Sequence, residues 1–282
     1  MVVEAKKNGH EPVRWNSIAD VQGLAITDVI CDCDGVLWRG SAPIPGAAEA
    51  IFNLRAMGLR LYFLTNHSSK PSSVLVQRLA GMGIQAAEEQ AFGSATLAAL
   101  AVLALPGFNP QNDLVYAIGC SGLLGELAKH GIRHLNHQDL RAVKAVVVGY
   151  DSEFDYAKLT MAADCLRGGV CAFIACSIGG TYPDNGRVLP GTGALVAAIA
   201  MASGRTPQVV GKPSANAFCV MQHRHPHLKS ETTLMIGDSL SSDVAFGKAC
   251  GLRTLLVETG IPEVADIQPD FVASSIGIFR NQ

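Results

Sequence analysis

Apolar residues follow two alternating patterns along this chain. Short, nearly continuous apolar runs are typical of strands buried on both faces, and they are separated by segments with apolar residues at helical spacing. The apolar runs predict strands at Ala25–Cys33, Arg60–Thr65, Leu114–Ile118, Ala145–Val148, Cys171–Cys176, Gln208–Val210, Thr233–Ile236 and Arg253–Val257. The segments between them predict helices at Ala47–Met57, Pro71–Met82, Ala95–Leu105, Ser121–His130, Tyr156–Arg167, Thr192–Ala202, Ala215–Gln222 and Ser242–Ala249. This alternation predicts an α/β fold with a doubly wound, mostly parallel sheet covered by helices on both faces.

The number of strand–helix units exceeds what one compact doubly wound sheet holds, so we expect one α/β unit to be inserted into another. Residues 1–22 are polar and aperiodic, and they predict an irregular lead-in. The stretch Tyr182-Pro183-Asp184-Asn185-Gly186 is a strong turn signal and predicts a hairpin tip near Arg187.

The composition is that of a folded protein with a large core. Of 282 residues, 49% are hydrophobic and only 16% are charged, which excludes intrinsic disorder. The formal net charge of −2 provides no basic surface for a phosphate backbone. We therefore expect no nucleic-acid polymer as a partner.

Nothing in the sequence predicts membrane association or export. The most apolar stretch, Ala95–Leu105, stops at Pro106 and is shorter than the ~20 residues that cross a bilayer. The first residues are charged and lack the apolar segment of a signal peptide. The eight cysteines form no CxxC pair, and several lie in apolar runs, as reduced buried cysteines do. We therefore expect a cytoplasmic protein with no membrane partner.

Two aspartates follow the first predicted strand, and chemistry in parallel sheets collects at the carboxyl ends of strands. Asp32 and Asp34 are two residues apart and lean to the same side, and Gly35 then allows a sharp turn. One carboxylate can act as a nucleophile while its neighbour protonates a leaving group. The alternative is that both are turn or helix-capping aspartates, and the pair alone does not separate the two interpretations.

Two further strand ends carry groups that bind anions. Thr65 and Asn66 end the strand Arg60–Thr65 just before a helix, and they offer hydrogen-bond donors to an anion; helix capping by the following serines is the alternative. Lys212 stands between a glycine and a proline after Gln208–Val210. It would neutralise a phosphate or a carboxylate pair, although most lysines only decorate the surface.

The last group of this kind follows the strand Thr233–Ile236. Asp238 and Asp243 can share a hard cation through oxygen ligands, or they can serve as a turn residue and a helix cap. Four strand ends of one sheet would then carry an aspartate pair, a hydroxyl, a lysine and a second aspartate pair. That set is what Mg²⁺-dependent phosphoryl transfer through an aspartyl-phosphate requires.

Four motifs carry a resemblance to a known family: DCDGVLW, FLTNHSS, VVGKPS and IGDSLSSD. In this order and spacing the chain resembles the haloacid dehalogenase superfamily. Within it, the chain is similar to the subfamily IIA phosphatases, typified by p-nitrophenyl phosphatases, phosphoglycolate phosphatase and ribonucleotide monophosphatases. The similarity extends from about Asp28 to Val272. It implies a Rossmann-like catalytic core at 1–93 and 190–282, and an inserted α/β cap at 94–189 that selects the substrate.

The resemblance assigns a role to each residue of the motifs. It implies that Asp32 is the nucleophile and Asp34 the general acid/base. It implies that Thr65 and Asn66 bind the phosphoryl group, and that Lys212 offsets charge on the phosphoryl oxygens and on the nucleophile.

The same resemblance implies a Mg²⁺ site. Asp32, Asp238 and the backbone carbonyl of Asp34 would be its ligands, and Asp243 would support the site. Related caps also often mediate dimers, so a homodimer through the cap is possible.

Three departures from the family pattern affect the expected substrate more than the expected chemistry. Ser239 stands where the family commonly has Arg or Lys, and His67 stands where it often has Asn. The stretch Cys176-Ser177-Ile178-Gly179 lacks the amide and the carboxylate of the family's Thr-Asn-Pro-Asp. The sequence therefore predicts a Mg²⁺-dependent hydrolase of a small phosphorylated metabolite. It leaves open phosphoglycolate, a nucleotide, a sugar phosphate and pyridoxal phosphate.

Two short motifs favour structural interpretations. Gly191-Thr192-Gly193 lacks the third glycine of a dinucleotide fingerprint and predicts a hinge or a helix start. His223-Arg224-His225-Pro226-His227 favours an exposed loop over a metal site.

Two other functions use the same fold. A dehalogenase also has an aspartate nucleophile but does not need Asp34 or the cation ligands. A non-catalytic regulatory module would not need the large inserted unit.

Overall fold

The computed structural model describes residues 11–135, 142–184 and 187–280, and it divides into two compact units. The first unit, residues 1–61 and 228–282, is built from both ends of the chain. The second unit, residues 62–227, is inserted between them in the sequence. The division falls within strand β5 (Arg60–Thr65). The expected boundaries of a cap at 94–189 are a different division and stay a prediction.

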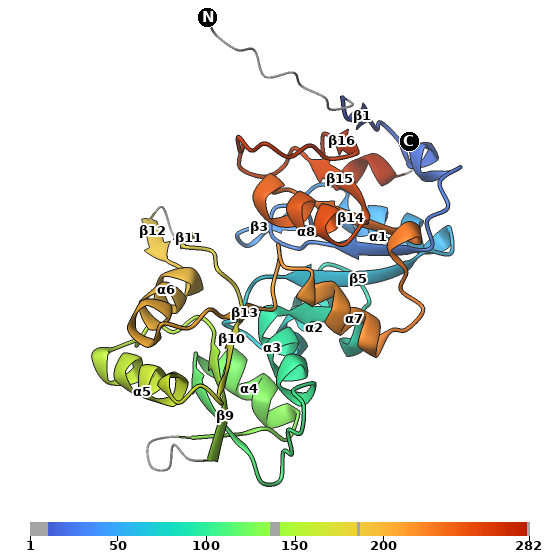
Figure 1. Cartoon of the computed structure of the whole chain (residues 1–282). Coiled ribbons are helices and arrows are strands. Elements are labelled where there is room, and N and C mark those ends of the chain that lie inside the picture. Colours follow the sequence, from blue (N-terminus) through green and yellow to red (C-terminus); the bar gives the residue numbers. More distant parts are fainter. Residues whose placement is uncertain (1–10, 136–141, 185–186, 281–282) are drawn as a thin grey trace, which may run out of the picture. The chain divides into compact units, whose positions relative to one another are not determined.

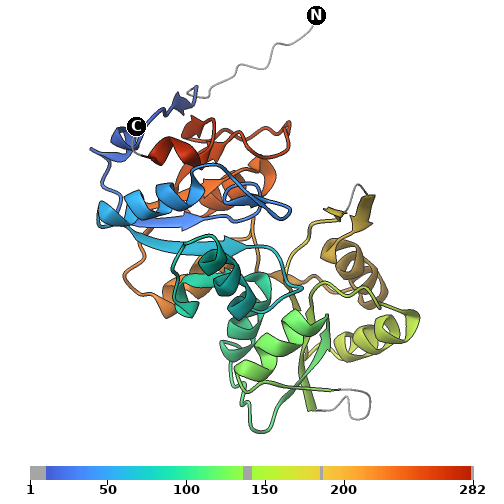
Figure 2. The ribbon, with the colours of Figure 1, turned by 180° about the vertical axis from the view of Figure 1, so that it is seen from behind.

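A parallel sheet forms the core of the first unit. Its strands, in spatial order, are β1 (Val13–Arg14), β16 (Phe271–Ala273), β15 (Arg253–Val257), β14 (Thr233–Gly237) and β2 (Asp28–Cys31). All residues of β2 and β14 are buried, as their mostly apolar sequence predicts. Helix α8 (Ala245–Ala249) lies in front of this sheet in Figure 1. Helix α1 (Ala47–Ala56) covers the opposite face and lies in front of the sheet in Figure 2, the view from behind. The predicted α/β fold with a parallel sheet is confirmed.

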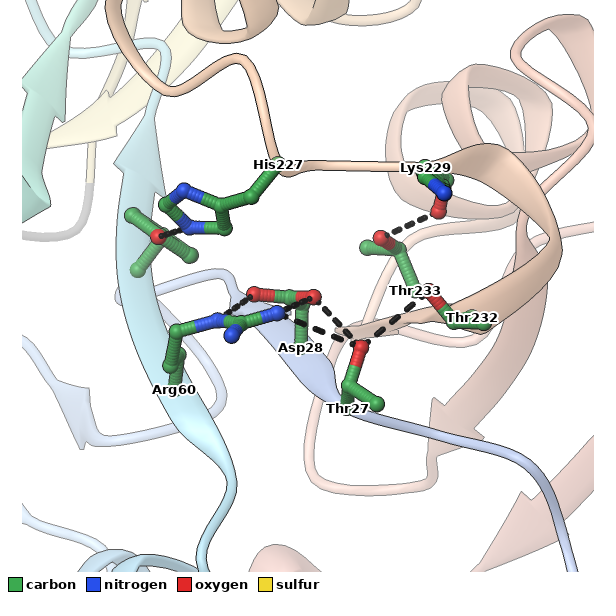
Figure 3. A network of polar contacts seen from close by, with 8 residues as sticks. Thr27, Asp28, Arg60, His227, Lys229, Thr232 and Thr233 are labelled. Carbon is green, nitrogen blue, oxygen red and sulfur yellow. Dashed lines mark hydrogen bonds and ion pairs between the residues drawn. The ribbon is translucent and has the colours of Figure 1, made fainter.

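An ion pair between a buried aspartate and an exposed arginine fixes the start of β2. Asp28 is fully buried and receives Nε of Arg60 at 2.6 Å and Nη2 at 2.7 Å, while the hydroxyl of Thr27 donates to it at 2.7 Å (Figure 3). A buried carboxylate is tolerated only with such partners. The pair therefore holds the first residue of β5 beside β2, at the end of the sheet opposite to the predicted catalytic aspartates.

The lead-in is more ordered than its sequence predicts. Residues 1–10 lie outside the described part, but Val13–Arg14 forms β1 and pairs in parallel with β16. Trp15 is buried and stacks on Phe271 with ring centroids 4.3 Å apart. The prediction of an irregular segment is wrong here, because edge pairing and one buried aromatic order a stretch that has no periodic pattern.

The second unit contains its own parallel sheet, with the spatial order β13 (Gln208–Val209), β10 (Ala172–Ala175), β9 (Val143–Val148), β7 (Leu114–Ile118) and β8 (Arg133–His134). Helices α5 (Tyr156–Arg167) and α6 (Thr192–Ser203) pack side by side against this sheet (Figure 1). The same unit contains α2 (Ser72–Gly81), α7 (Asn216–Arg224) and strand β6 (Ala91–Gly93), which pairs with β5. Thus β13, which follows Leu189, belongs to the same sheet as β9 and β10, and α6 packs against that sheet.

The most apolar stretch of the chain forms α3 (Ser94–Leu103). Most of its side chains are buried, and it packs against α4 (Ser121–Lys129) (Figure 2). Among the described residues, no helix combines the length and the apolar character that crossing a membrane requires.

Two expectations about strands and helices need correction. The segment Gln208–Val210 was expected in the same sheet as the strands that carry the aspartates, but Gln208 and Val209 pair with Ile174 and Ala175 of β10. The helix expected at Ser242–Ala249 begins earlier, as a π-helix at Leu240–Val244 that continues into α8. In each case the apolar pattern locates an element without revealing its partner strand or its pitch.

Two antiparallel hairpins complete the fold. Strands β3 (Trp38–Arg39) and β4 (Ala42–Pro43) pair in the first unit, and β11 (Thr181–Asp184) and β12 (Arg187–Pro190) pair in the second. The predicted hairpin near Arg187 is therefore confirmed, while its tip at 185–186 lies outside the described residues.

Candidate active site

The first aspartate loop continues directly from β2. The backbone amide of Asp32 donates to the carbonyl of Ile236 at 2.8 Å, so the chain is still in register with β14 at this residue. Gly35 then adopts φ +87°, which side chains rarely permit, and its amide donates to the carbonyl of Trp38 at 2.6 Å. The resulting turn leaves Asp32 buried and Asp34 exposed, with Oδ1 of Asp34 accepting a bond from Nε1 of Trp38 at 2.7 Å.

The second aspartate loop follows β14, the neighbour of β2. Asp243 is 2% exposed, and its Oδ2 accepts hydrogen bonds from the backbone amides of Asp238 at 3.0 Å and Ser239 at 3.1 Å. The carboxylate of Asp243 therefore fixes the turn that carries Asp238. The role expected for Asp243 in supporting a metal site stays a prediction.

The two loops bring three carboxylates together. Asp32, Asp238 and Asp243 each place one oxygen within 4.8 Å of the others. Among the residues that the structure describes, this is the group of acidic, histidine or cysteine side chains that lie close enough to hold a metal ion. The carboxylate of Asp34 does not belong to the group, and its expected contribution through the backbone carbonyl stays a prediction.

The surroundings of this cluster fit a small, hard cation. Carboxylate oxygens are the ligands that Mg²⁺ prefers, and three negative charges at this separation repel one another unless a cation offsets them. Glycines surround the cluster: a Cβ atom at Gly35 or Gly260 would overlap the carboxylate of Asp238, and one at Gly237 would overlap that of Asp243. The close packing of backbone against these carboxylates therefore requires glycine at all three positions.

The second unit holds the other expected site residues. The side-chain amide of Asn66 pairs with the backbone of Lys212, donating to its carbonyl at 2.8 Å and accepting from its amide at 2.8 Å. Lys212 is 2% exposed, and its ammonium donates to the carbonyl of Leu64 at 3.1 Å. The hydroxyl of Thr65 accepts the amide of His67 at 3.1 Å. The structure thus brings Thr65, Asn66 and Lys212 together.

This second group has the chemistry of an anion site. A buried ammonium is costly unless polar or negatively charged partners surround it, and a hydroxyl beside it adds a hydrogen-bond donor. Gly211 permits the close packing, because a Cβ atom there would approach Oδ1 of Asn66 to 2.6 Å. Asn66 therefore positions Lys212 as well as standing beside Thr65.

Sequence reasoning missed polar residues that follow β15. Thr259 donates its hydroxyl to the carbonyl of Gly35 at 2.6 Å, and Glu263 accepts bonds from Ser239 and Ser241 at 2.8 Å each. The rule that chemistry collects at strand ends, applied to Arg253–Val257, would have pointed to this segment.

The two remaining motifs have structural roles. Gly191 is the residue before the first turn of α6, which confirms the helix start predicted there. His223 and Arg224 belong to α7, His225 packs against Tyr62 with ring centroids 4.9 Å apart, and Nε2 of His227 bonds with the hydroxyl of Tyr62 at 2.7 Å (Figure 3). The expected exposed loop is confirmed for Pro226 and His227, whereas His223 and Arg224 are exposed residues of the helix.

The stretch that departs from the family pattern lies beside the second group. The carbonyl of Cys176 lies against Gly211, and both Cys176 and Ser177 are buried. Burial raises the pKa of the Cys176 thiol, so it stays protonated at neutral pH. Cys176 and Ser177 are therefore packing residues beside Gly211.

Comparisons with known proteins agree with these motifs. A family model described as haloacid dehalogenase-like hydrolase matches residues 29–133, and one described as HAD-hydrolase-like matches residues 209–277. The chain is 35% identical to human glycerol-3-phosphate phosphatase, over 92% of this chain and 90% of that protein. It is 38% identical to human chronophin, over 92% of this chain and 89% of that protein. Among solved structures, p-nitrophenyl phosphatase from Archaeoglobus fulgidus has a TM-score of 0.81 at 28% identity, covering 89% of this chain and 97% of that chain.

Proposed function

The chain belongs to the haloacid dehalogenase-like hydrolase family, and we propose that this hydrolase of phosphate monoesters works through an aspartyl-phosphate on Asp32 with the help of a divalent cation. The observation that carries the proposal is the cluster of Asp32, Asp238 and Asp243, whose oxygens lie within 4.8 Å of one another at adjacent strand ends. A phosphatase of this kind needs such a carboxylate group, because the same residues must hold a cation and present a nucleophile.

The carboxylates of Asp32 and Asp238 and the backbone carbonyl of Asp34 would hold Mg²⁺, with Asp243 fixing the turn of Asp238. The ion would offset negative charge on the phosphoryl oxygens. The donor set is entirely oxygen, which suits Mg²⁺ better than a metal that prefers nitrogen or sulfur.

The proposed reaction has two steps at phosphorus. Asp32 attacks the phosphorus atom in line, the ester P–O bond breaks, and Asp34 donates its proton to the leaving oxygen. The deprotonated Asp34 then takes a proton from a water molecule that attacks the aspartyl-phosphate. Inorganic phosphate leaves and both carboxyl groups return to their initial states. The exposure of Asp34, against the burial of Asp32, supports this division of roles.

The anion group of the second unit would bind the transferring phosphoryl group. Thr65 would donate a hydrogen bond to a phosphoryl oxygen, and Lys212 would offset the charge that develops in the transition state. The burial of Lys212 and its fixation by Asn66 support this proposal, because a preorganised charge stabilises a transition state more than a mobile one does.

We further propose that the substrate is a small phosphorylated metabolite and that the protein acts in the cytoplasm. The names of the relatives indicate several phosphate esters. The Cys176–Gly179 stretch, which the family resemblance implies to face the active site, differs from the family pattern. A homodimer through the inserted unit stays a prediction. A screen of phosphorylated metabolites with purified protein would identify the substrate.

The proposal is tested by the metal dependence of p-nitrophenyl phosphate turnover. Chelation with EDTA should abolish activity, and Mg²⁺ should restore it where Ca²⁺ does not, because the smaller ion imposes a stricter octahedral geometry. Full activity in excess EDTA would refute the cation-dependent mechanism. Absence of phosphate release from every ester would refute the proposed function itself.

A further inference from the structure

A segment outside the four motifs, residues 259–263, contacts both aspartate loops of the first unit. The hydroxyl of Thr259 donates to the carbonyl of Gly35 at 2.6 Å, next to the turn that carries Asp34. Arg39, in strand β3 directly after this turn, donates to the carbonyl of Thr259. Gly260 lies so close to Asp238 that any side chain there would overlap its carboxylate. The segment thus packs on the first loop through Thr259 and on the second through Gly260.

Glu263 ends this segment and makes two hydrogen bonds to the second loop. Its Oε1 accepts the hydroxyl of Ser239 at 2.8 Å, and its Oε2 accepts the backbone amide of Ser241 at 2.8 Å. The hydroxyl oxygen of Ser239 in turn accepts the amide of Ser242 at 3.1 Å and so caps the π-helix at Leu240–Val244. One carboxylate therefore fixes the residue that directly follows Asp238.

Glu263 is ionised in this setting. Partial burial raises its pKa, but the hydrogen bonds from Ser241 and Ser239 outweigh that effect and hold the pKa below its usual value. An ionised carboxylate accepts both bonds at once, and such charge-assisted bonds are stronger than bonds between neutral groups.

We propose that Glu263 is a positioning residue for the cation site. It acts through Ser239: the carboxylate holds the Asp238–Ser239 turn from one side while Asp243 holds the two backbone amides of the turn from the other. Its own hydrogen bonds go to Ser239 and Ser241, so its effect on the cation is indirect. Ser239 stands where related proteins commonly carry a basic residue, so this arrangement belongs to the present sequence.

The proposal rests on the proposed function only in that a divalent cation binds to the aspartate cluster. Two variants each remove one partner of the hydrogen bond between Ser239 and Glu263. Glu263→Ala removes the accepting carboxylate, and Ser239→Ala removes the donating hydroxyl. A third, Glu263→Gln, keeps an acceptor oxygen and should restore part of the effect. Glu231→Ala is the matched control: it removes an exposed glutamate of the same unit that precedes β14, whereas the aspartate loop follows that strand.

The measurement is Mn²⁺ binding to each purified full-length protein by electron paramagnetic resonance, with competition by Mg²⁺. Circular dichroism of the metal-free proteins confirms that each variant is folded. We expect the dissociation constant to rise about 10-fold in Glu263→Ala and Ser239→Ala, less in Glu263→Gln, and to stay unchanged in Glu231→Ala. Turnover of p-nitrophenyl phosphate by the two alanine variants should recover at saturating Mg²⁺.

If the Mn²⁺ dissociation constants of Glu263→Ala and Ser239→Ala both stay within about twofold of the wild-type value, the proposal is wrong. This result would not contradict the phosphatase function. An equal loss in Glu231→Ala would overturn the proposal too, because the effect would then come from overall charge. If Glu263→Ala does not fold, the Mn²⁺ dissociation constant of Ser239→Ala alone tests the proposal. If wild-type protein hydrolyses esters but binds no divalent cation, both this inference and the cation-dependent mechanism are wrong.

Discussion

Oδ2 of Asp243 accepts the backbone amide of Asp238 at 3.0 Å, so the buried carboxylate of Asp243 fixes the backbone that carries Asp238. The same oxygen accepts the amide of Ser239 at 3.1 Å. Asp243 therefore has two roles. Its hydrogen bonds fix the turn, which an asparagine could also do, and its negative charge attracts a cation, which an asparagine could not do. These two roles can be separated by substitution.

Asp243→Asn should lower the cation affinity and leave the unfolding free energy almost unchanged. Asp243→Ala should lower both the cation affinity and the unfolding free energy. The asparagine oxygen can still accept the two amides, but the alanine leaves them without a partner, which costs about 1–3 kcal/mol of unfolding free energy. Urea denaturation measures the unfolding free energy, and Mn²⁺ binding measures the cation affinity. Equal stability of the two variants would show that the amide bonds of Asp243 do not hold the turn.

Gly35→Ala should weaken cation binding and turnover by at least about 10-fold. The added Cβ would overlap the carboxylate of Asp238, and the backbone at φ +87° disfavours any side chain. Gly40→Ala is the matched control, because Gly40 also has positive φ, at +57°, but a Cβ atom there meets nothing within 4 Å. Mn²⁺ titration measures the cation affinity of each variant, and p-nitrophenyl phosphate hydrolysis measures its turnover. A similar loss in both variants would mean that strain in the turn, and not the overlap with Asp238, is responsible.

Lys212→Met should reduce kcat/KM for phosphate esters by about 10²-fold or more while the protein stays folded. Methionine has a similar length and no charge, so it removes the ammonium from a site that is only 2% exposed without leaving a large cavity. Lys229→Met, at an exposed lysine, serves as the control. Steady-state kinetics with p-nitrophenyl phosphate provides the measurement. Wild-type kcat/KM in Lys212→Met would remove this residue from the phosphoryl-binding group.

Asp270→Asn should lower the unfolding free energy by about 1–3 kcal/mol at neutral pH. Partial burial raises the pKa of Asp270, but the hydrogen bonds from Lys248 and Thr254 outweigh it, and the pKa lies below its usual value. A carboxyl group with a lowered folded-state pKa stabilises the fold above its unfolded-state value of about 3.9. That contribution is lost as the pH falls through the folded-state pKa.

The difference between Asp270→Asn and wild type should therefore narrow as the pH falls below about 4. Urea denaturation across this range provides the measurement. Asp164→Asn, which breaks an exposed ion pair with Arg167, should change stability by less than about 1 kcal/mol at any pH. A constant difference for Asp270→Asn at all pH values would show that its charge is not the stabilising element.

The apolar pattern predicts the position of elements well and their partners poorly. Arg60–Thr65, Leu114–Ile118 and Arg253–Val257 are strands over the predicted residues, because each is a buried run between polar turns. Gln208–Val209 is also a strand, yet it pairs with β10 in the second sheet. Hydrophobicity shows that a strand is buried, while its neighbour depends on the path of the chain between the strands.

The candidate site shows the same division. Asp32, Asp238 and Asp243 are found together because each follows or lies near the end of an apolar strand, which sequence reveals. Thr259, Gly260 and Glu263 escaped notice because their importance lies in contacts with two loops that are distant in sequence. The strand-end rule points to the segment that follows Arg253–Val257, but only a structure shows which loops its residues contact.

The covalent role of Asp32 is the central claim, and it is tested most directly by trapping the phosphorylated protein. A wild-type reaction with a phosphate ester is quenched in acid, and the peptides are mapped by mass spectrometry. The account predicts one added phosphoryl group on the peptide that contains Asp32. It also predicts that Asp32→Asn lacks this group, stays folded and loses at least ~10³-fold in turnover. Turnover above about a tenth of the wild-type rate in Asp32→Asn, or a phosphoryl group on a different residue, would contradict the account.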